Sequence, residues 1–232
     1  GPVRRRYVVV EGLIGVGKTT LCRLLQRERG AELFLEPAAT NPFLEPFYQE
    51  PERYAFPVQM FYLINRWRQQ SAIRQQDLFS TLVVSDYLFE KDRLFAEKTL
   101  PADELELYDR FAGALGEQTP TPDLLIFLDA PTEVILSRIE RRRAPGEEAI
   151  SPDYLDDLRD RYLSLLSGWT RCPVLRLDNT DMNYADDPGA QVRLLEWIDA
   201  ALEGAPLPPG APGSITDREA QPSLFGSDSG GT

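Results

Sequence analysis

The stretch "VVVEGLIGVGKTTLCRLL", Val8 to Leu25, decides the fold of this chain. Its apolar run rich in valine predicts a buried strand, and the leucines that follow at helical spacing predict an amphipathic helix. Between strand and helix, Gly12 to Thr19 matches the pattern G-x-x-x-x-G-K-[ST]. A strand before the pattern and a helix after it are the context that a phosphate-binding loop requires.

The residue types of this loop suit the binding of a nucleotide. Glycines let the backbone approach and turn, so that amide groups and the helix N-terminus face an anion. The lysine adds a mobile cation, and the first threonine can coordinate magnesium. A glycine-rich turn without a ligand is the alternative. We assign nucleotide binding to Gly12, Gly15, Gly17, Lys18, Thr19 and Thr20.

Length and charge limit the classes of partner. The chain has 232 residues, a formal net charge of −12 and no histidine. This charge argues against a nucleic acid or an anionic membrane as the main partner, because both would repel the chain. Two distant cysteines, Cys22 and Cys172, and the lack of a signal-peptide pattern favour a cytoplasmic location. No apolar run approaches the roughly 20 residues that a membrane-spanning helix needs.

Short β-rich runs alternate with longer helical patterns along the chain. This alternation predicts an α/β fold, with a five-stranded parallel sheet flanked by helices. Long helices are predicted at Pro51–Gln76 and Ser151–Gly168. From residue 204 the sequence is rich in Gly, Pro and Ser, so we predict one folded domain over 3–203 and a disordered tail over 204–232. The predicted strands are 6–10, 33–35, 81–86, 124–129 and 173–178.

Two carboxylates stand at the ends of predicted strands. Glu36 ends the second strand and Asp86 ends the third. In a parallel sheet these ends border the crevice in which ligands bind. Asp86 is therefore a candidate for a second magnesium contact, and Glu36 could take a proton from an attacking hydroxyl. A surface acid before a turn would explain either residue alone, but their joint placement favours a site.

These residues resemble the deoxyribonucleoside kinases, particularly the bacterial deoxyadenosine and deoxyguanosine kinase branch, from about Tyr7 to Ile198. The resemblance implies a P-loop kinase fold with a mobile arginine-rich lid, the use of ATP and magnesium, and a homodimer. It also implies that a deoxyribonucleoside is phosphorylated on its 5′-hydroxyl for nucleotide salvage. Beyond the phosphate loop, it rests on "EPAATNPFLEPFYQEPERYAFPVQMFYLINR", "SDYLFEKDRLFA", "SRIERRRAPGEEAISPDYL" and "PVLRLD".

The resemblance also implies a role for individual residues. Glu36 matches the catalytic base, and Lys18 belongs to the catalytic set through the phosphate loop. The other matches are Gln59 for reading the base edge, Arg66 and Asp92 for a charged pair near the base, Tyr48 and Glu147 for holding the sugar 3′-hydroxyl, and Arg138 and Arg142 for binding phosphate from the lid.

The chemistry of the base-reading residues supports their assignment. Gln59 and Arg66 lie seven residues apart, about two helical turns, so both can face one crevice. Glutamine offers a donor and an acceptor together, whereas an arginine beside Asp92 leaves little room for a thymine methyl group. We therefore expect a purine nucleoside or deoxycytidine to be preferred over thymidine. For Arg66, a solvated helix face is the alternative. Candidates for stacking on the base, or for plain core, are Phe56, Phe61 and Phe89.

The run "RIERRR", residues 138–143, is the local basic cluster that an anionic ligand needs in this acidic chain. Arginines stabilise the charge that develops on a transferring phosphoryl group. An exposed, salt-bridged helix end would look similar. The chain departs from the family after the third strand, where many members carry Glu-Arg-Ser and this chain has Asp86, Tyr87 and Leu88. We assign Tyr87 no catalytic role, and which cation replaces the missing arginine is open, with Arg143 as one possibility.

Two other functions fit parts of the sequence. A nucleoside monophosphate kinase such as thymidylate kinase shares the loop and the lid, and a kinase fold that only binds ligands would keep both. In the tail, "QPSLF" resembles the short peptides by which bacterial replication proteins bind the sliding clamp, with Gln221, Leu224 and Phe225 as its contacts. Alternatively, this apolar pair folds back onto the kinase domain or its dimer partner.

Overall fold

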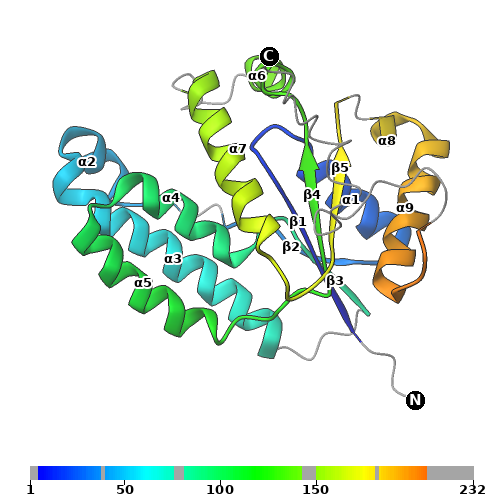
Figure 1. Ribbon diagram of the computed structural model, residues 1–232, viewed down its shortest axis with the longest axis horizontal. Coiled ribbons are helices and arrows are strands. Elements are labelled where there is room, and N and C mark those ends of the chain that lie inside the picture. Colours follow the sequence, from blue (N-terminus) through cyan, green and yellow to red (C-terminus); the bar gives the residue numbers. More distant parts are fainter. Residues whose placement is uncertain (1–4, 38–39, 76–80, 143–149, 181–182, 208–232) are drawn as a thin grey trace, which may run out of the picture. The chain divides into compact units, whose positions relative to one another are not determined.

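The structure, a computed structural model, describes residues 5–37, 40–75, 81–142, 150–180 and 183–207 (Figure 1). The described residues form two compact units. The first takes its residues from 1–33, 80–86 and 122–232, and the second from 34–79 and 87–121. The assignment of 3–203 to one kinase domain with a tail from 204 stays a prediction.

The first unit contains the predicted five-stranded sheet, with strand order β2-β3-β1-β4-β5. Strand β1 pairs in parallel with β3 and β4, and β4 pairs in parallel with β5. Val8 at the centre of the sheet lies opposite Val84 on one side and Leu124 on the other. The strands are β1 (Arg6–Gly12), β2 (Glu32–Phe34), β3 (Leu82–Ser85), β4 (Leu124–Asp129) and β5 (Val174–Asp178).

Two helices of the first unit, α7 and α9, begin at a side chain that caps them. The Ser151 hydroxyl accepts a hydrogen bond from the Tyr154 amide at 3.1 Å and caps α7, which lies within the helix predicted over Ser151–Gly168. The Asp187 carboxylate caps α9 in the same way, and Gly204 ends that helix with a φ of 67°. The helices are α1 (Lys18–Arg29), α6 (Thr132–Arg142), α7 (Pro152–Ser167), α8 (Asn183–Asp186) and α9 (Pro188–Glu203).

Helix α7 covers one side of the sheet at its centre. Glu11 of β1 lies opposite Phe127 of β4, so both side chains point to the same side. The Tyr162 hydroxyl of α7 donates to Glu11 at 3.2 Å, and its ring lies 5.9 Å from that of Phe127. The strand positions are buried on both sides, which explains why the strands read as continuous apolar runs.

The second unit is helical. Helices α3, α4 and α5 contact one another, and Figure 1 shows α3 and α5 running side by side. Their shared core contains Leu63, Phe89 and Tyr108, with Phe56 packed against it. The elements are α2 (Leu44–Gln49), α3 (Pro51–Gln75), the 3₁₀ turn η1 (Phe89–Lys91), α4 (Asp92–Thr99) and α5 (Ala102–Gly116).

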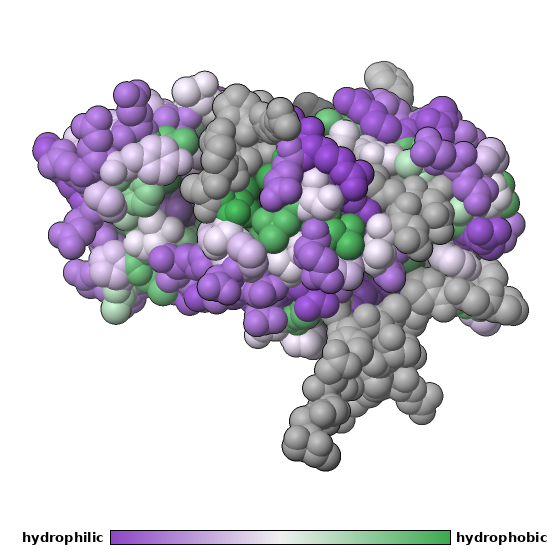
Figure 2. Space-filling model, turned by 90° about the horizontal axis from the view of Figure 1, so that it is seen from above, coloured by the Kyte–Doolittle hydropathy of each residue, from purple (hydrophilic) through white to green (hydrophobic). Residues whose placement is uncertain are grey.

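The surface agrees with a sequence rich in charged residues. Figure 2 shows a face on which hydrophilic residues predominate and hydrophobic residues lie in small separate areas. Within the described ranges, no helix has the length and apolar character needed to cross a membrane.

Candidate active site

The phosphate loop lies between β1 and α1 in the first unit. Its three predicted glycines all have positive φ angles. Gly17 has a φ of 106° where α1 begins. A Cβ atom on Gly12 would lie 2.6 Å from the Leu128 carbonyl oxygen, so a side chain has no room there. The backbone of this loop therefore takes a course that glycine allows and other residues resist.

Two side chains from outside the loop hold it at Val16. The Asn179 amide donates to the Val16 carbonyl oxygen, and the Arg138 guanidinium donates to the same oxygen at 3.3 Å. Arg138 also donates to the carbonyl oxygens of Asn179 and Thr180, each at 2.7 Å. Arg138 thus contacts the loop through its backbone, and its predicted phosphate contact stays a prediction. Sequence analysis missed Asn179, which follows β5 in "RLDNT".

Lys18 of the loop is held by a carboxylate that sequence analysis missed. Its Nζ lies 3.6 Å from Oε1 of Glu11, whose side chain is completely buried. The same oxygen accepts hydrogen bonds from the Gly12 amide at 3.0 Å and from Tyr162. The buried Glu11 carboxylate therefore ties the start of the loop to Lys18 and to α7. The signal was present in the sequence, because Glu11 is the one charged residue in "VVVEG".

The residues predicted to hold magnesium lie in the first unit. Thr19 is exposed in the first turn of α1, and Asp86 directly follows β3 and is half-buried. Burial raises the pKa of the Cys22 thiol to about 12, and the Asp86 carboxylate adds to this effect, so Asp86 lies close to α1. Thr19 lies three residues before Cys22, so both lie on the face of α1 that is close to Asp86. A hydroxyl and a carboxylate suit magnesium, which keeps several waters and phosphate oxygens among its ligands.

Glu36 lies in the second unit at the centre of a charged cluster. Arg66 donates to Glu36 Oε1 from Nε at 3.1 Å and from Nη2 at 2.6 Å. Lys91 donates from Nζ to Glu36 Oε2 at 2.8 Å. Arg66 also donates to one oxygen of Asp92, and the Tyr108 hydroxyl donates to the other. The predicted pair of Arg66 and Asp92 is therefore joined directly to Glu36.

Burial and charge act together on this cluster. Burial alone would raise the pKa of Glu36, but Lys91 and Arg66 outweigh it and lower that pKa to about 2. Burial raises the pKa of Asp92, although Arg66 and Tyr108 act in the opposite sense. Burial and the Asp92 carboxylate raise the pKa of Tyr108, which keeps its hydroxyl a hydrogen-bond donor. The Arg66 side chain is only 10% exposed, so it does not belong to a solvated helix face.

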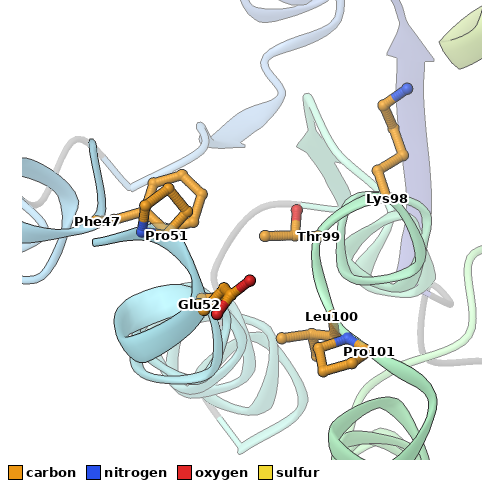
Figure 3. A pocket seen from close by; sticks show the side chains of 8 residues that line it. Phe47, Pro51, Glu52, Lys98, Thr99, Leu100 and Pro101 are labelled. Carbon is orange, nitrogen blue, oxygen red and sulfur yellow. The ribbon is translucent and has the colours of Figure 1, made fainter. Parts of the chain in front are cut away.

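Gln59 lies beside a pocket of the second unit. Its Nε2 donates to the Thr99 hydroxyl at 3.5 Å, whereas its buried Oε1 has no hydrogen-bond partner among the described residues. A buried polar atom without a partner is costly in a folded protein, so Gln59 is suited to a ligand. The pocket has a volume of about 620 Å³ (Figure 3). It is lined from one side by Phe47, Pro51, Glu52 and Ala55, and from the other by Lys98, Thr99, Leu100 and Pro101.

The other predicted residues lie on the surface, in the helical core or outside the described residues. Tyr48 of α2 is 72% exposed, and its ring lies 5.9 Å from that of Phe47. Phe89 belongs to the helical core, which is the plain alternative to stacking on a base. Arg142 is exposed at the end of α6. Glu147, Arg143 and the clamp-like peptide 221–225 lie outside the described residues.

Comparisons with known proteins agree with the predicted family. A family model described as deoxynucleoside kinase matches residues 8–203. Deoxyguanosine kinase of Bacillus subtilis (strain 168) is 34% identical over 157 residues, which cover 67% of this chain and 76% of the relative. Deoxyadenosine/deoxycytidine kinase of the same organism is 30% identical over 206 residues, covering 86% of this chain and 94% of the relative.

The fold also resembles solved structures. Deoxyadenosine kinase from M. mycoides, solved with dCMP and a flexible dCDP, superposes with a TM-score of 0.65 at 22% identity. The match covers 82% of this chain and 96% of that protein.

Proposed function

Because the chain belongs to the deoxynucleoside kinase family, we propose that it transfers the γ-phosphoryl group of a nucleoside triphosphate to the 5′-hydroxyl of a deoxyribonucleoside. The observation that carries this proposal is the cluster around Glu36, a carboxylate held by two cations in the same unit as Gln59. A second support is the phosphate loop with its three positive-φ glycines.

The phosphate loop binds the triphosphate in this proposal. Backbone amides of residues 12–19 face the phosphates, and Lys18 exchanges its contact with Glu11 for a phosphate oxygen. Thr19 and Asp86 would hold magnesium, which neutralises charge on the phosphates when it is bound. Arg138 and Arg142 add positive charge at the transferring group. Transfer forms a bond between the 5′-oxygen and the γ-phosphorus and breaks the bridge to the β-phosphate.

Glu36 accepts the proton that the 5′-hydroxyl loses. With a pKa of about 2, its carboxylate is ionised at neutral pH and can receive a hydrogen bond from the hydroxyl. So acidic a group is a weak base. It suits a loose transition state, in which the attacking oxygen has formed little of its bond to phosphorus and the hydroxyl keeps its proton until late, so that a strong base is not needed.

The proposal also assigns side chains to the recognition of the base and the sugar. Gln59 offers its buried amide to the base edge, and the buried pair of Arg66 and Asp92 excludes a thymine methyl group. Tyr48 and Glu147 hold the 3′-hydroxyl. We therefore propose a purine deoxynucleoside or deoxycytidine as the preferred substrate, in agreement with the names of the relatives from Bacillus subtilis.

A steady-state assay tests this function. The four natural deoxynucleosides are offered with ATP and magnesium, and their four 5′-monophosphates are offered in parallel. We expect deoxyadenosine, deoxyguanosine or deoxycytidine to be phosphorylated best. Thymidine as the best acceptor would refute the proposed base pocket. A preference for monophosphates would indicate a nucleoside monophosphate kinase, and binding without turnover would indicate an inactive kinase fold.

A homodimer in the cytoplasm is a further part of the proposal. Leu107 and Phe111 are about half exposed and lie one turn apart on α5, and Ile64 of α3 is also exposed. Exposed apolar side chains on neighbouring helices suit a helix-packed dimer. Light scattering on the purified protein measures its mass, and a monomer at micromolar concentration would exclude the dimer.

The tail carries a separate proposal, which rests on the sequence alone. Gln221, Leu224 and Phe225 would bind the sliding clamp and place the kinase near sites of replication or repair. Leucine and phenylalanine would anchor in an apolar pocket while glutamine hydrogen-bonds at its rim. The test titrates a peptide of residues 217–230 against the clamp of the same organism, beside a peptide with Leu224→Ala and Phe225→Ala. Equal binding by both peptides would exclude the contact.

A further inference from the structure

We propose that Lys91, supported by the Tyr87 ring, positions the Glu36 carboxylate for proton transfer and takes the place of the cation that the sequence lacks after Asp86. This inference rests on the proposed function, in which Glu36 is the base. The sequence left this cation unassigned, and Lys91 was not among the predicted residues.

Lys91 is placed unusually for a lysine. Its side chain is 4% exposed, and its Nζ lies 2.8 Å from Glu36 Oε2. Lysine is almost never fully buried unless it is paired, because its charge loses the solvation of water. Nζ also lies 5.5 Å from the centre of the Tyr87 ring, within the range of a cation–π contact. The η1 turn ends at Lys91, so the backbone fixes the point from which this side chain extends.

Lys91 and Arg66 divide the two oxygens of Glu36 between them. Arg66 donates twice to Oε1, and Lys91 donates to Oε2. Arg66 alone would hold one oxygen and leave the carboxylate free to turn about its last bond. With a cation on each oxygen, the carboxylate plane has one orientation. A fixed orientation matters because a general base must lie within hydrogen-bonding reach of the proton that it removes.

Tyr87 holds the backbone beside Glu36. Its buried hydroxyl donates to Gln69 Oε1 at 2.6 Å, and Gln69 Nε2 donates to the Leu35 carbonyl oxygen at 2.8 Å. Leu35 directly precedes Glu36, so this chain of hydrogen bonds fixes the main chain from which the carboxylate extends. Tyr87 thus acts twice, on the backbone through its hydroxyl and on the Lys91 ammonium through its ring.

The test compares Lys91→Met with Lys91→Arg, which keeps the charge. Arg110→Met is the control, because it removes an exposed cation from the same unit. We expect Lys91→Met to lower kcat by about 10²-fold, the usual size of a general-base effect, with a smaller change in KM. Lys91→Arg should restore most of this loss, and Arg110→Met should match the wild type.

The pH dependence separates positioning from a structural role. Removing Lys91 takes away a cation that lowers the pKa of Glu36, so that pKa should rise. The acid limb of kcat/KM should then move to higher pH in Lys91→Met and stay in place in Lys91→Arg. An NMR titration of the ¹³C-labelled Glu36 carboxyl, assigned with Glu36→Gln, should show the same rise without any turnover. If Lys91→Met does not fold, Lys91→Gln serves with the same expectation.

The outcomes distinguish this inference from the proposed function. An active wild type with an unchanged kcat and acid limb in Lys91→Met would overturn the inference alone. A wild type that phosphorylates no deoxynucleoside would overturn the function, and the NMR titration would then decide whether Lys91 acts on Glu36. Equal loss in Lys91→Met and Lys91→Arg, without a shift of the Glu36 titration, would mean that Lys91 only stabilises the fold.

Discussion

Removing the hydroxyl of Tyr108 should destabilise the protein through a single buried hydrogen bond. Tyr108 is completely buried, and its hydroxyl donates to the Asp92 oxygen that Arg66 does not bind. Tyr108→Phe keeps the ring in the core with Leu63 and Phe89, so it opens almost no cavity. It leaves a buried carboxylate oxygen without the donor it has in the wild type, and that oxygen cannot turn to water.

The expected size follows from the chemistry of the lost bond. Hydrogen bonds to charged groups contribute about 1.5–3 kcal/mol, and a buried acceptor left without a partner costs a similar amount. We therefore expect the free energy of unfolding to fall by about 1.5–3 kcal/mol. At about 2–4 °C per kcal/mol for a chain of this size, Tm should fall by about 3–12 °C.

Urea unfolding and calorimetry measure this change, and Tyr48→Phe is the matched control. Tyr48 lies in the same unit and loses the same hydroxyl, but it is 72% exposed. The control should stay within about 0.5 kcal/mol of the wild type. If Tyr108→Phe is as stable as Tyr48→Phe, then the Asp92 oxygen does not need the hydroxyl, and the network around Arg66 is not the one described above.

Three further variants and one pH series test the site. Glu36→Gln should lower the rate constant of phosphoryl transfer by at least about 10²-fold in a single-turnover assay. Calorimetry should show that deoxynucleoside binding is largely intact. A rate near that of the wild type would mean that another residue is the base. The lowered pKa of Glu36 stabilises the folded protein fully above pH 4.5, the ordinary pKa of a glutamate, and this stabilisation is lost as the pH falls to about 2. The free energy of unfolding of the wild type should therefore fall between pH 5 and 2. That of Glu36→Gln should depend less on pH over this range. Arg66→Met with Asp92→Asn should raise the kcat/KM of thymidine relative to the other nucleosides, and an unchanged ratio would exclude this pair from base selection. Gly12→Ala should abolish ATP binding, measured by calorimetry, because a Cβ there would lie 2.6 Å from the Leu128 oxygen.

The sheet and the phosphate loop could be predicted because their signals are local. Buried parallel strands are continuous apolar runs, and the loop pattern needs only the strand before it and the helix after it. The five strands were found, and β2 differs only by one residue at each end, at Glu32–Phe34 in place of 33–35. A shift of one residue is expected, because a strand of three residues has too little sequence pattern to define its ends.

The cluster around Glu36 could be predicted only in part, because its contacts join distant segments. Arg66 and Asp92 were assigned as a pair through the family resemblance, because their bonds to each other and to Glu36 span 26 to 30 residues and no local pattern measures such a distance. Lys91 was overlooked although it directly precedes Asp92, because a lysine in a charged stretch usually lies in water. What distinguishes it is burial against Glu36 and the Tyr87 ring, and this burial depends on contacts between segments that lie far apart in the sequence.

The composition of this cluster explains why it tolerates burial. When both carboxylates are ionised, Glu36 and Asp92 carry two negative charges that balance the two positive charges of Arg66 and Lys91, so the group is then neutral. Protonating Glu36 would leave a net positive charge in a buried place, which is why its pKa falls to about 2 despite burial. In the proposed reaction that positive charge would arise as the 5′-oxygen attacks an anionic phosphoryl group. The same two cations that make Glu36 a weak base would then favour the approach of the anion.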